Sequence, residues 1–177
     1  MRSRSPQVVV MGVAGAGKST VARLLAERLG AEVGDADDFH PPANVAKMSA
    51  GEPLEEADRS PWLLAVSAWM QERADAGRTA VMACSSLRRA HRDVLRAAAG
   101  DIWFLHLHGS PELLSRRLGS RVGHFMPPEL LGSQLAALEP LGRDEAGMTE
   151  DVTAPPAVLA ERAARALRLG EGVARVQ

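Results

Sequence analysis

The sequence predicts an α/β protein of three layers, in which helices cover both faces of a parallel sheet of about five strands. Runs of strand length that are rich in valine and other apolar residues alternate along the chain with segments of helical periodicity. Short polar or glycine-rich motifs directly follow the first, second and third of these runs. The chain has 177 residues, of which 46% are hydrophobic, enough to bury the core of one domain over 1–177.

The predicted elements follow one another in a regular order. Val8, Val9 and Val10 form a β-branched run that suits a strand over 7–11 buried on both faces. A helix over 18–29 follows, and Gly30 ends it. Asp58 is the expected N-cap of a long helix that ends near residue 75. The other expected strands are 32–35, 79–84, 102–107 and a short one near 150–153, and the other expected helices are 41–48, 88–99, 111–120, 129–138 and 157–169.

The composition argues against several classes of function. The 21 basic residues are interspersed with 22 acidic ones for a net charge of −1, so we expect neither nucleic acid nor a membrane as partner. No apolar run approaches the ~20 residues of a membrane span. The single cysteine, Cys84, excludes an internal disulfide and fits a reducing compartment, so we expect a cytoplasmic protein. Residues 1–6 are predicted to be a disordered tail, and 139–156 to be the most mobile connection.

The glycine-rich segment after the first strand is a phosphate-binding motif. Its sequence, GVAGAGKS over Gly12–Ser19, matches the P-loop pattern G-x-x-x-x-G-K-[ST] in full and lies between a strand and a helix, as the pattern requires. The glycines let backbone N–H groups approach phosphate oxygens, and the following helix points its positive end at the same place. The motif therefore predicts a P-loop fold with a nucleoside triphosphate (ATP) site that includes Gly12, Val13, Ala14, Gly15, Ala16, Gly17, Lys18, Ser19 and Thr20.

Acidic residues follow the second predicted strand. Three carboxylates crowded at a strand end repel one another unless a cation lies near, and Mg²⁺ bound to a nucleotide would supply one. We expect Ser19 and Asp35 to serve the Mg²⁺, and Asp37 to accept the proton of the acceptor hydroxyl. The simpler alternative is an acidic turn that caps the next helix, which is a sufficient role for Asp38. His40 is open between a packing role and a substrate contact.

Taken together, these motifs resemble the gluconokinase family, the small P-loop kinases of D-gluconate. The resemblance covers about residues 7–140 and implies ATP and Mg²⁺ as cofactors, phosphorylation of the 6-hydroxyl of D-gluconate, and a homodimer. Ser86 stands where the family usually has alanine, Arg88 and Arg89 replace lysines, and His91 stands where an aromatic ring is common. The residues that carry the resemblance are the P-loop, 35–41, Asn44, Lys47-Met48, 51–54, 58–63, 83–88, Arg92-Asp93, 121–127, Gln134 and 138–140.

An anionic polyol needs cations and hydrogen-bonding groups, and the matching segments supply both. Arg59 follows Asp58 near a helix start, where its planar guanidinium could bind a carboxylate through two parallel hydrogen bonds. The ordinary alternative for each arginine is a solvated helix face. Cys84 is expected to be an inert buried thiol, and Trp62 and Trp69 to be core residues. The predicted substrate-binding residues are Asp37, His40, Lys47, Arg59, Ser85, Ser86, Arg88, Arg92, His124 and Gln134.

A basic stretch after the fourth strand predicts a lid segment over about 117–128. We expect Arg117 to lie against the adenine, Arg121 to stabilise the charge on the transferring phosphoryl group, and His124 to contact the substrate. The ordinary alternative is a polar helix end, with arginines near its negative pole. Lys18, Asp37 and Arg121 are thus the predicted catalytic residues.

Three other functions are compatible with a P-loop. A shikimate kinase shares the Asp-x-Asp after strand two but would carry a Gly-Gly-rich turn after strand three, where this chain has Cys84-Ser85-Ser86. A GTPase switch needs Asn-Lys-x-Asp, which is absent, and Asp144–Gly147 fits Asp-x-x-Gly only at an unexpected position. A polynucleotide kinase is disfavoured by the neutral charge and by the scarcity of aromatic residues.

Overall fold

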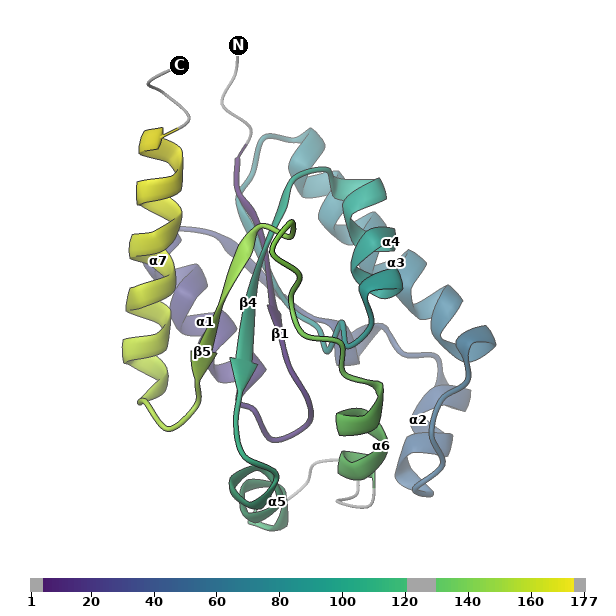
Figure 1. Ribbon diagram of the computed structural model, residues 1–177. Coiled ribbons are helices and arrows are strands. Elements are labelled where there is room, and N and C mark those ends of the chain that lie inside the picture. Colours follow the sequence, from purple (N-terminus) through teal and green to yellow (C-terminus); the bar gives the residue numbers. More distant parts are fainter. Residues whose placement is uncertain (1–4, 121–129, 174–177) are drawn as a thin grey trace.

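Five parallel strands form one sheet in the computed structural model, which describes residues 5–120 and 130–173. The order across the sheet is β2-β3-β1-β4-β5, so β1 is paired on both sides (Figure 1). Because the strands are parallel, their carboxyl ends lie at one edge, and the loops that follow them meet there. The strands are β1 (Gln7–Met11), β2 (Glu32–Asp35), β3 (Ala80–Ala83), β4 (Ile102–His108) and β5 (Gly147–Asp151).

Helices cover both faces of this sheet, as the alternation of strand and helix patterns predicts. Helices α1 and α7 lie together on one face, while α3 and α4 lie together on the other (Figure 1). The α-helices are α1 (Lys18–Leu29), α2 (Pro42–Ser49), α3 (Glu56–Asp75), α4 (Arg89–Ala99), α5 (Pro111–Gly119), α6 (Leu130–Ala137) and α7 (Pro156–Val173), and a 3₁₀ helix, η1, spans Ala36–Phe39.

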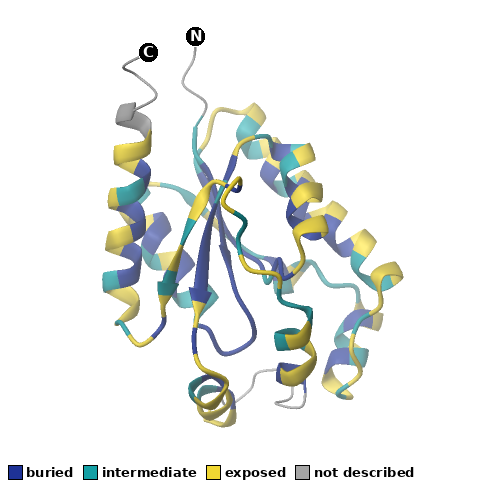
Figure 2. Cartoon of the chain, viewed as in Figure 1, coloured by how far each residue is buried: buried dark blue, intermediate teal, exposed yellow. Residues whose placement is uncertain are grey.

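The buried strands explain why each helix layer has its own core. Successive side chains of a strand point to opposite faces, so Val8 and Val10 pack against the α1 and α7 layer. Val9 and Met11 pack against the α3 and α4 layer. Figure 2 shows β1 and β4 buried, whereas the outer faces of the helices are exposed. The apolar runs of the sequence thus predict strands buried on both sides, and the structure confirms them.

The start of α3 differs from the prediction. Glu55, rather than Asp58, is the N-cap, and Asp58 lies three residues later in a reciprocal capping box. In it the Asp58 carboxylate accepts a hydrogen bond from the Glu55 N–H at 2.9 Å. A carboxylate at either position can satisfy the free N–H groups of a helix start, so composition alone did not distinguish them.

The last strand also differs from the prediction, since β5 spans Gly147–Asp151 and not 150–153. It begins at a glycine because the chain approaches β4 very closely there: a Cβ on Gly147 would overlap Phe104 O. Residues 139–156, predicted as the most mobile connection, therefore contain a sheet strand. At the other end of the chain, Ser5 and Pro6 are not a free tail, because they accept or donate hydrogen bonds with 77–80.

Within the described part of the chain, no helix is both long and apolar enough to cross a bilayer. Cys84 is buried, and burial raises the pKa of its thiol to about 11, so the predicted inert cysteine is consistent with its surroundings.

β4 contains a buried polar side chain whose desolvation is not offset by any hydrogen bond to the described residues. His106 is 3% exposed, and neither ring nitrogen has a hydrogen-bond partner among the described residues. Burial, with smaller contributions from His108 and Arg92, lowers the pKa of His106 from 6.5 to about 4. The His106 ring is therefore protonated near pH 6.5 in the unfolded chain but only near pH 4 in the folded protein. The free energy of unfolding decreases as the pH falls through this interval.

We expect His106→Leu to remove this acid sensitivity. As the pH falls from 7.5 to 4.5, the free energy of unfolding of the unsubstituted protein should decrease by on the order of 2 kcal/mol more than that of the variant. Urea unfolding at a series of pH values measures the difference. Parallel stability profiles for the two proteins would show that His106 is not the responsible group.

Candidate active site

The loop between β1 and α1 has the backbone geometry of a phosphate cradle. Gly15 and Gly17 have φ values of 83° and 89°, in the left-handed region that favours glycine. Space is restricted as well, because a Cβ on Gly15 would lie 2.9 Å from Leu114 O and one on Gly12 would lie 2.8 Å from Leu107 O. Gly17 directly precedes the first residue of α1, so the free N–H groups of the helix start face the same place as the loop.

Lys18 and Ser19 extend from the first turn of α1 into a cavity of about 240 Å³. The Lys18 Nζ donates a hydrogen bond to Val13 O at 3.1 Å, which holds the ammonium group over its own loop. A cation held there can neutralise the charge of phosphate oxygens that accept hydrogen bonds from the loop N–H groups.

Ser19 and Asp35 meet at the end of β2. Ser19 Oγ donates to Asp35 Oδ2 at 2.5 Å, and the other carboxylate oxygen accepts the Asp37 N–H at 3.0 Å as the cap of η1. These hard oxygen atoms beside a phosphate cradle fit the preferences of Mg²⁺, which typically keeps phosphate and water oxygens as its other ligands. Among the described residues, no group of three or more His, Cys, Asp or Glu side chains is placed to hold a metal ion.

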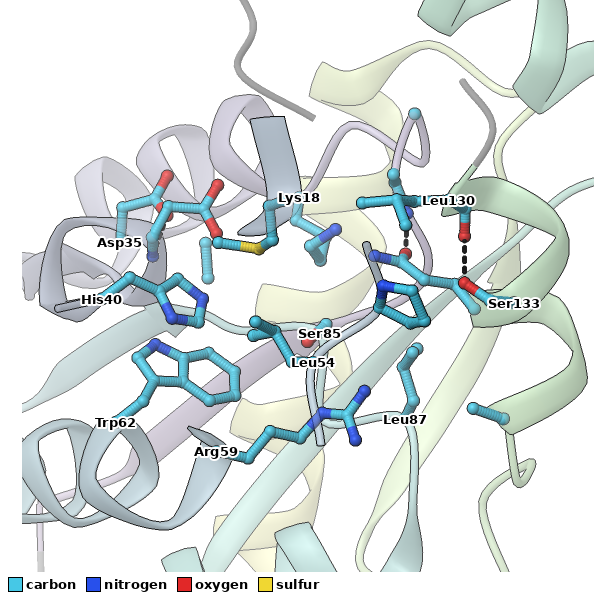
Figure 3. A pocket seen from close by; sticks show the side chains of 18 of the residues that line it. Lys18, Asp35, His40, Leu54, Arg59, Trp62, Ser85, Leu87, Leu130 and Ser133 are labelled. Carbon is cyan, nitrogen blue, oxygen red and sulfur yellow. Dashed lines mark hydrogen bonds between the residues drawn. The ribbon is translucent and has the colours of Figure 1, made fainter. Parts of the chain in front are cut away.

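The same cavity extends from the cradle to the residues that follow β2 and β3. Asp35, His40 and Trp62 lie on one side of it, Leu130 and Ser133 on the other, and Arg59 reaches in from α3 (Figure 3). The predicted site residues that line it are Ala14, Gly15, Gly17, Lys18, Ser19, Asp35, Asp37, His40, Arg59, Ser85, Arg88 and Gln134. Three cationic side chains and two carboxylates therefore surround one small volume.

His40 is held as a neutral ring in this cavity. Its ring stacks on Trp62 with centroids 4.4 Å apart, and burial, followed by the charge of Arg59, lowers its pKa to about 4. The Asn44 side-chain amide donates to Asp58 O at 2.9 Å and lies 3.2 Å from His40 Nδ1. Because that amide nitrogen is a donor, Nδ1 accepts and the ring proton is on Nε2. His40 thus offers hydrogen bonds but no charge at neutral pH.

Gln134 connects α6 to the phosphate cradle. Its Oε1 accepts a hydrogen bond from the Ala14 N–H at 2.7 Å, across 120 positions of sequence. The loop after β3 touches the cradle as well, since the Gly12 N–H donates to Ser85 O at 3.3 Å. The cradle is therefore tied to both segments that line the far side of the cavity.

Three predicted substrate-binding residues do not line the cavity. Lys47 forms an ion pair with Asp58 at 2.8 Å and does not line the cavity. Ser86 is 1% exposed and its hydroxyl oxygen is buried. Arg92 is fully buried in an ion pair with Glu145, so no part of it can reach a ligand. Each side chain lies near the site in sequence, but the backbone directs it elsewhere.

Other predicted residues lie outside the cavity or outside the described residues. Arg117 donates to Val152 O at 2.8 Å, beyond the end of β5, and its contact with adenine stays a prediction. Arg121, His124 and most of the predicted lid lie outside the described residues. Gly12, Val13, Ala16 and Thr20 belong to the cradle segment but do not line the cavity.

Sequence reasoning missed most of the apolar walls of the cavity. Trp62 was expected to be a core residue only; it is 4% exposed, donates through Nε1 to Ala36 O at 2.7 Å, and also lines the cavity under His40. Apolar residues give no chemical signal in a sequence, although several lie in the segments that resemble the kinase family. The others are Met48, Pro53, Leu54, Ala83, Leu87, Leu130, Ala137 and the polar Ser133.

A family model and known proteins match most of this chain. The family described as AAA domain matches residues 8–141. A gluconokinase from Gluconobacter oxydans is 52% identical over 138 residues, which are 78% of this chain and 78% of that protein.

Solved structures with high identity share the whole fold. A sugar kinase from Janibacter sp. HTCC2649 has a TM-score of 0.89 at 48% identity, covering 93% of this chain and 95% of that one. A gluconokinase from Sinorhizobium meliloti 1021 has a TM-score of 0.84 at 41% identity, covering 97% of each chain. A shikimate kinase from Acinetobacter baumannii, at 21% identity and a TM-score of 0.61, shares the fold alone.

The crowding around Gly15 gives a test of the cradle. We expect Gly15→Ala to abolish triphosphate binding and to cost more than about 2 kcal/mol of stability, because the new methyl group meets Leu114 O in a disfavoured backbone conformation. Gly77→Ala is the matched control, since Gly77 is also left-handed but has open space and lies outside the cavity. It should cost about 1 kcal/mol and leave binding unchanged. Equal triphosphate affinity in both variants, measured by calorimetry, would contradict the cradle geometry.

Proposed function

The chain belongs to the AAA-domain family and, within it, to the gluconokinases, and on that premise we propose that it transfers the γ-phosphoryl group of ATP to the 6-hydroxyl of D-gluconate. The products are ADP and 6-phospho-D-gluconate. The observation that carries the proposal is the single cavity in which Lys18 and the phosphate cradle lie beside Asp37, Arg59 and Arg88. A triphosphate and a small anionic polyol require these two sets of groups.

The cations of the cavity fall into two groups with different tasks. Lys18, with the loop N–H groups, neutralises the triphosphate, and Ser19 and Asp35 would hold Mg²⁺ there, which when bound adds charge neutralisation at the phosphates. Arg59 and Arg88 line the acceptor part and suit the gluconate carboxylate, since guanidinium groups pair with carboxylates through parallel hydrogen bonds. His40 and Ser85 add neutral hydrogen-bonding groups for the hydroxyls.

Asp37 is the group in the cavity that we propose as general base. The oxygen of the 6-hydroxyl attacks the γ-phosphorus, the bond to the oxygen that bridges the β- and γ-phosphates breaks, and the hydroxyl proton passes to the Asp37 carboxylate. Asp37 follows β2 and lines the cavity together with Lys18 of the phosphate cradle, which supports this role. Arg121, outside the described residues, stays a predicted stabiliser of the transferring group.

The proposal also includes the cellular location and the oligomeric state of the protein. We propose a cytoplasmic setting, which the buried single thiol suits, and a homodimer, which rests on the family resemblance. Gel filtration with light scattering measures the second directly.

The substrate is tested with a panel of sugar acids and related acids. Purified protein should consume ATP rapidly with D-gluconate, and phosphorus NMR of the product should show a phosphomonoester on carbon 6. Shikimate belongs in the panel because the shikimate kinase fold is shared. Turnover with shikimate and none with gluconate would overturn the proposal.

Asp37→Asn tests the general base. The amide cannot take a proton, so kcat should fall by about 10²-fold or more while the affinity for ATP stays nearly unchanged. Asp38→Asn is the matched control, because Asp38 is exposed, does not line the cavity, and should tolerate the change. If Asp37→Asn retains near-normal kcat, a different group accepts the proton.

A further inference from the structure

A buried ion pair lies directly behind the acceptor part of the cavity. Arg92 Nε and Nη2 donate to the two carboxylate oxygens of Glu145 at 2.7 and 2.9 Å, and both side chains are 1% exposed or less. Burial alone raises the pKa of Glu145, but hydrogen bonds from Arg92, Gly142 N and Arg96 outweigh it and hold that pKa at about 2. The Glu145 carboxylate is therefore ionised at neutral pH.

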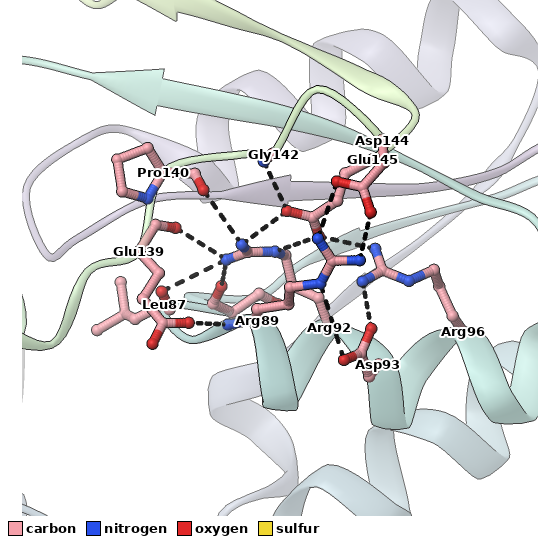
Figure 4. A network of polar contacts seen from close by, with 11 residues as sticks. Leu87, Arg89, Arg92, Asp93, Arg96, Glu139, Pro140, Gly142, Asp144 and Glu145 are labelled. Atoms are coloured by element: carbon pink, nitrogen blue, oxygen red, sulfur yellow. Dashed lines mark hydrogen bonds and ion pairs between the residues drawn. The ribbon is translucent and has the colours of Figure 1, made fainter.

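The remaining N–H groups of Arg92 are directed at backbone carbonyls of two separate loops. Nη1 lies 3.0 Å from Ser86 O and 3.4 Å from Leu87 O, in the loop after β3. It also lies 3.1 Å from Glu139 O, while Nη2 lies 3.4 Å from Pro140 O, in the segment after α6 (Figure 4). One guanidinium group thus donates hydrogen bonds to loop carbonyls that lie outside the described strands and helices.

Two further contacts join the same loops. The Glu139 N–H donates to Leu87 O at 2.7 Å, and its carboxylate accepts the Arg89 N–H at the start of α4 at 2.6 Å. The loop after β3 needs such support, because Ser86 has a φ of 46°, in the left-handed region that residues other than glycine rarely adopt. Strain of this kind persists only where the surroundings impose it.

Both joined segments carry residues of the cavity. The loop after β3 bears Ser85, Leu87 and Arg88, and α6 bears Ser133 and Gln134. Each segment also touches the phosphate cradle, through Ser85 O and Gln134 Oε1. Hydrogen bonds therefore connect the cradle to the loop after β3, that loop to Arg92, Arg92 to the segment after α6, and α6 back to the cradle. These contacts surround the acceptor part of the cavity.

We propose that Arg92 is a positioning residue for the acceptor, an inference that rests on the proposed kinase function. It touches neither substrate and acts through Ser85 and Arg88, whose places relative to the cradle it sets. Stability alone is a weak reason for this arrangement, since well-packed apolar residues often replace a buried ion pair without loss of stability. Apolar side chains, however, cannot donate the hydrogen bonds that Arg92 gives to the loop carbonyls.

The test uses a single and a double substitution. Arg92→Met leaves the Glu145 carboxylate buried without its main partner, so this variant loses stability as well as positioning. Arg92→Met with Glu145→Met removes both buried charges and should recover part of the lost melting temperature, while Ser86 O and Glu139 O stay without their donor. In both variants we expect KM for gluconate to rise at least about tenfold, with a smaller change in KM for ATP.

The matched control is Arg96→Met. Arg96 donates to the same Glu145 carboxylate at 2.9 Å but contacts neither the loop after β3 nor the segment after α6 through their carbonyls. It should lower stability moderately and leave both KM values unchanged. Recovery of a normal gluconate KM in the double variant, or an equal rise in Arg96→Met, would show that the ion pair is structural only.

A second measurement separates this inference from the proposed function. Backbone amides of residues 85–88 should exchange hydrogen faster in the double variant than in the unsubstituted protein, without any substrate present. If the unsubstituted protein does not phosphorylate gluconate, the proposed function fails, while the exchange result still decides whether Arg92 holds the loop. Unchanged exchange at 85–88 would overturn the positioning role by itself.

Discussion

The parallel pairing of β2, β3 and β1 is the constraint on which the rest of the site depends. Because the three strands run in one direction side by side, the P-loop, the acidic segment after β2 and the serine loop after β3 all begin at the same edge of the sheet. The apolar layers on either face of β1 hold this edge in place, so core packing and site geometry have a common origin.

The sheet sets the direction of the loops, but polar contacts set their separation. Ser85 O and Gln134 Oε1 accept hydrogen bonds from the P-loop, and Arg92 joins the segments that carry them. A buried charge contributes little net stability on average, because desolvation offsets the attraction within the pair. Its value here is geometric, since a planar group with several donors fixes several carbonyls at once. Asp144–Gly147, which fits a GTPase switch pattern, in fact supplies Glu145 to this network.

The sequence predicted the fold, the P-loop after the first strand and the acidic segment after the second, because each has a local signature in periodicity or spacing. It misplaced Lys47, Ser86 and Arg92 because the direction of a side chain depends on backbone turns and on distant partners. Glu145, for example, lies 53 positions from Arg92. The apolar wall at Trp62 was missed because a tryptophan can serve the core and the cavity together. Spacing therefore predicted which segments meet, and only packing showed which side chains face the cavity.

The central claim is that nucleotide and acceptor occupy neighbouring parts of one cavity and react directly. Initial velocities measured while ATP and D-gluconate are both varied test this claim. Direct transfer within a complex of both substrates predicts double-reciprocal lines that intersect. Parallel lines would indicate a phosphorylated enzyme intermediate, and ATP hydrolysis at a rate independent of gluconate would show that the cavity does not hold the acceptor; either result would contradict the account.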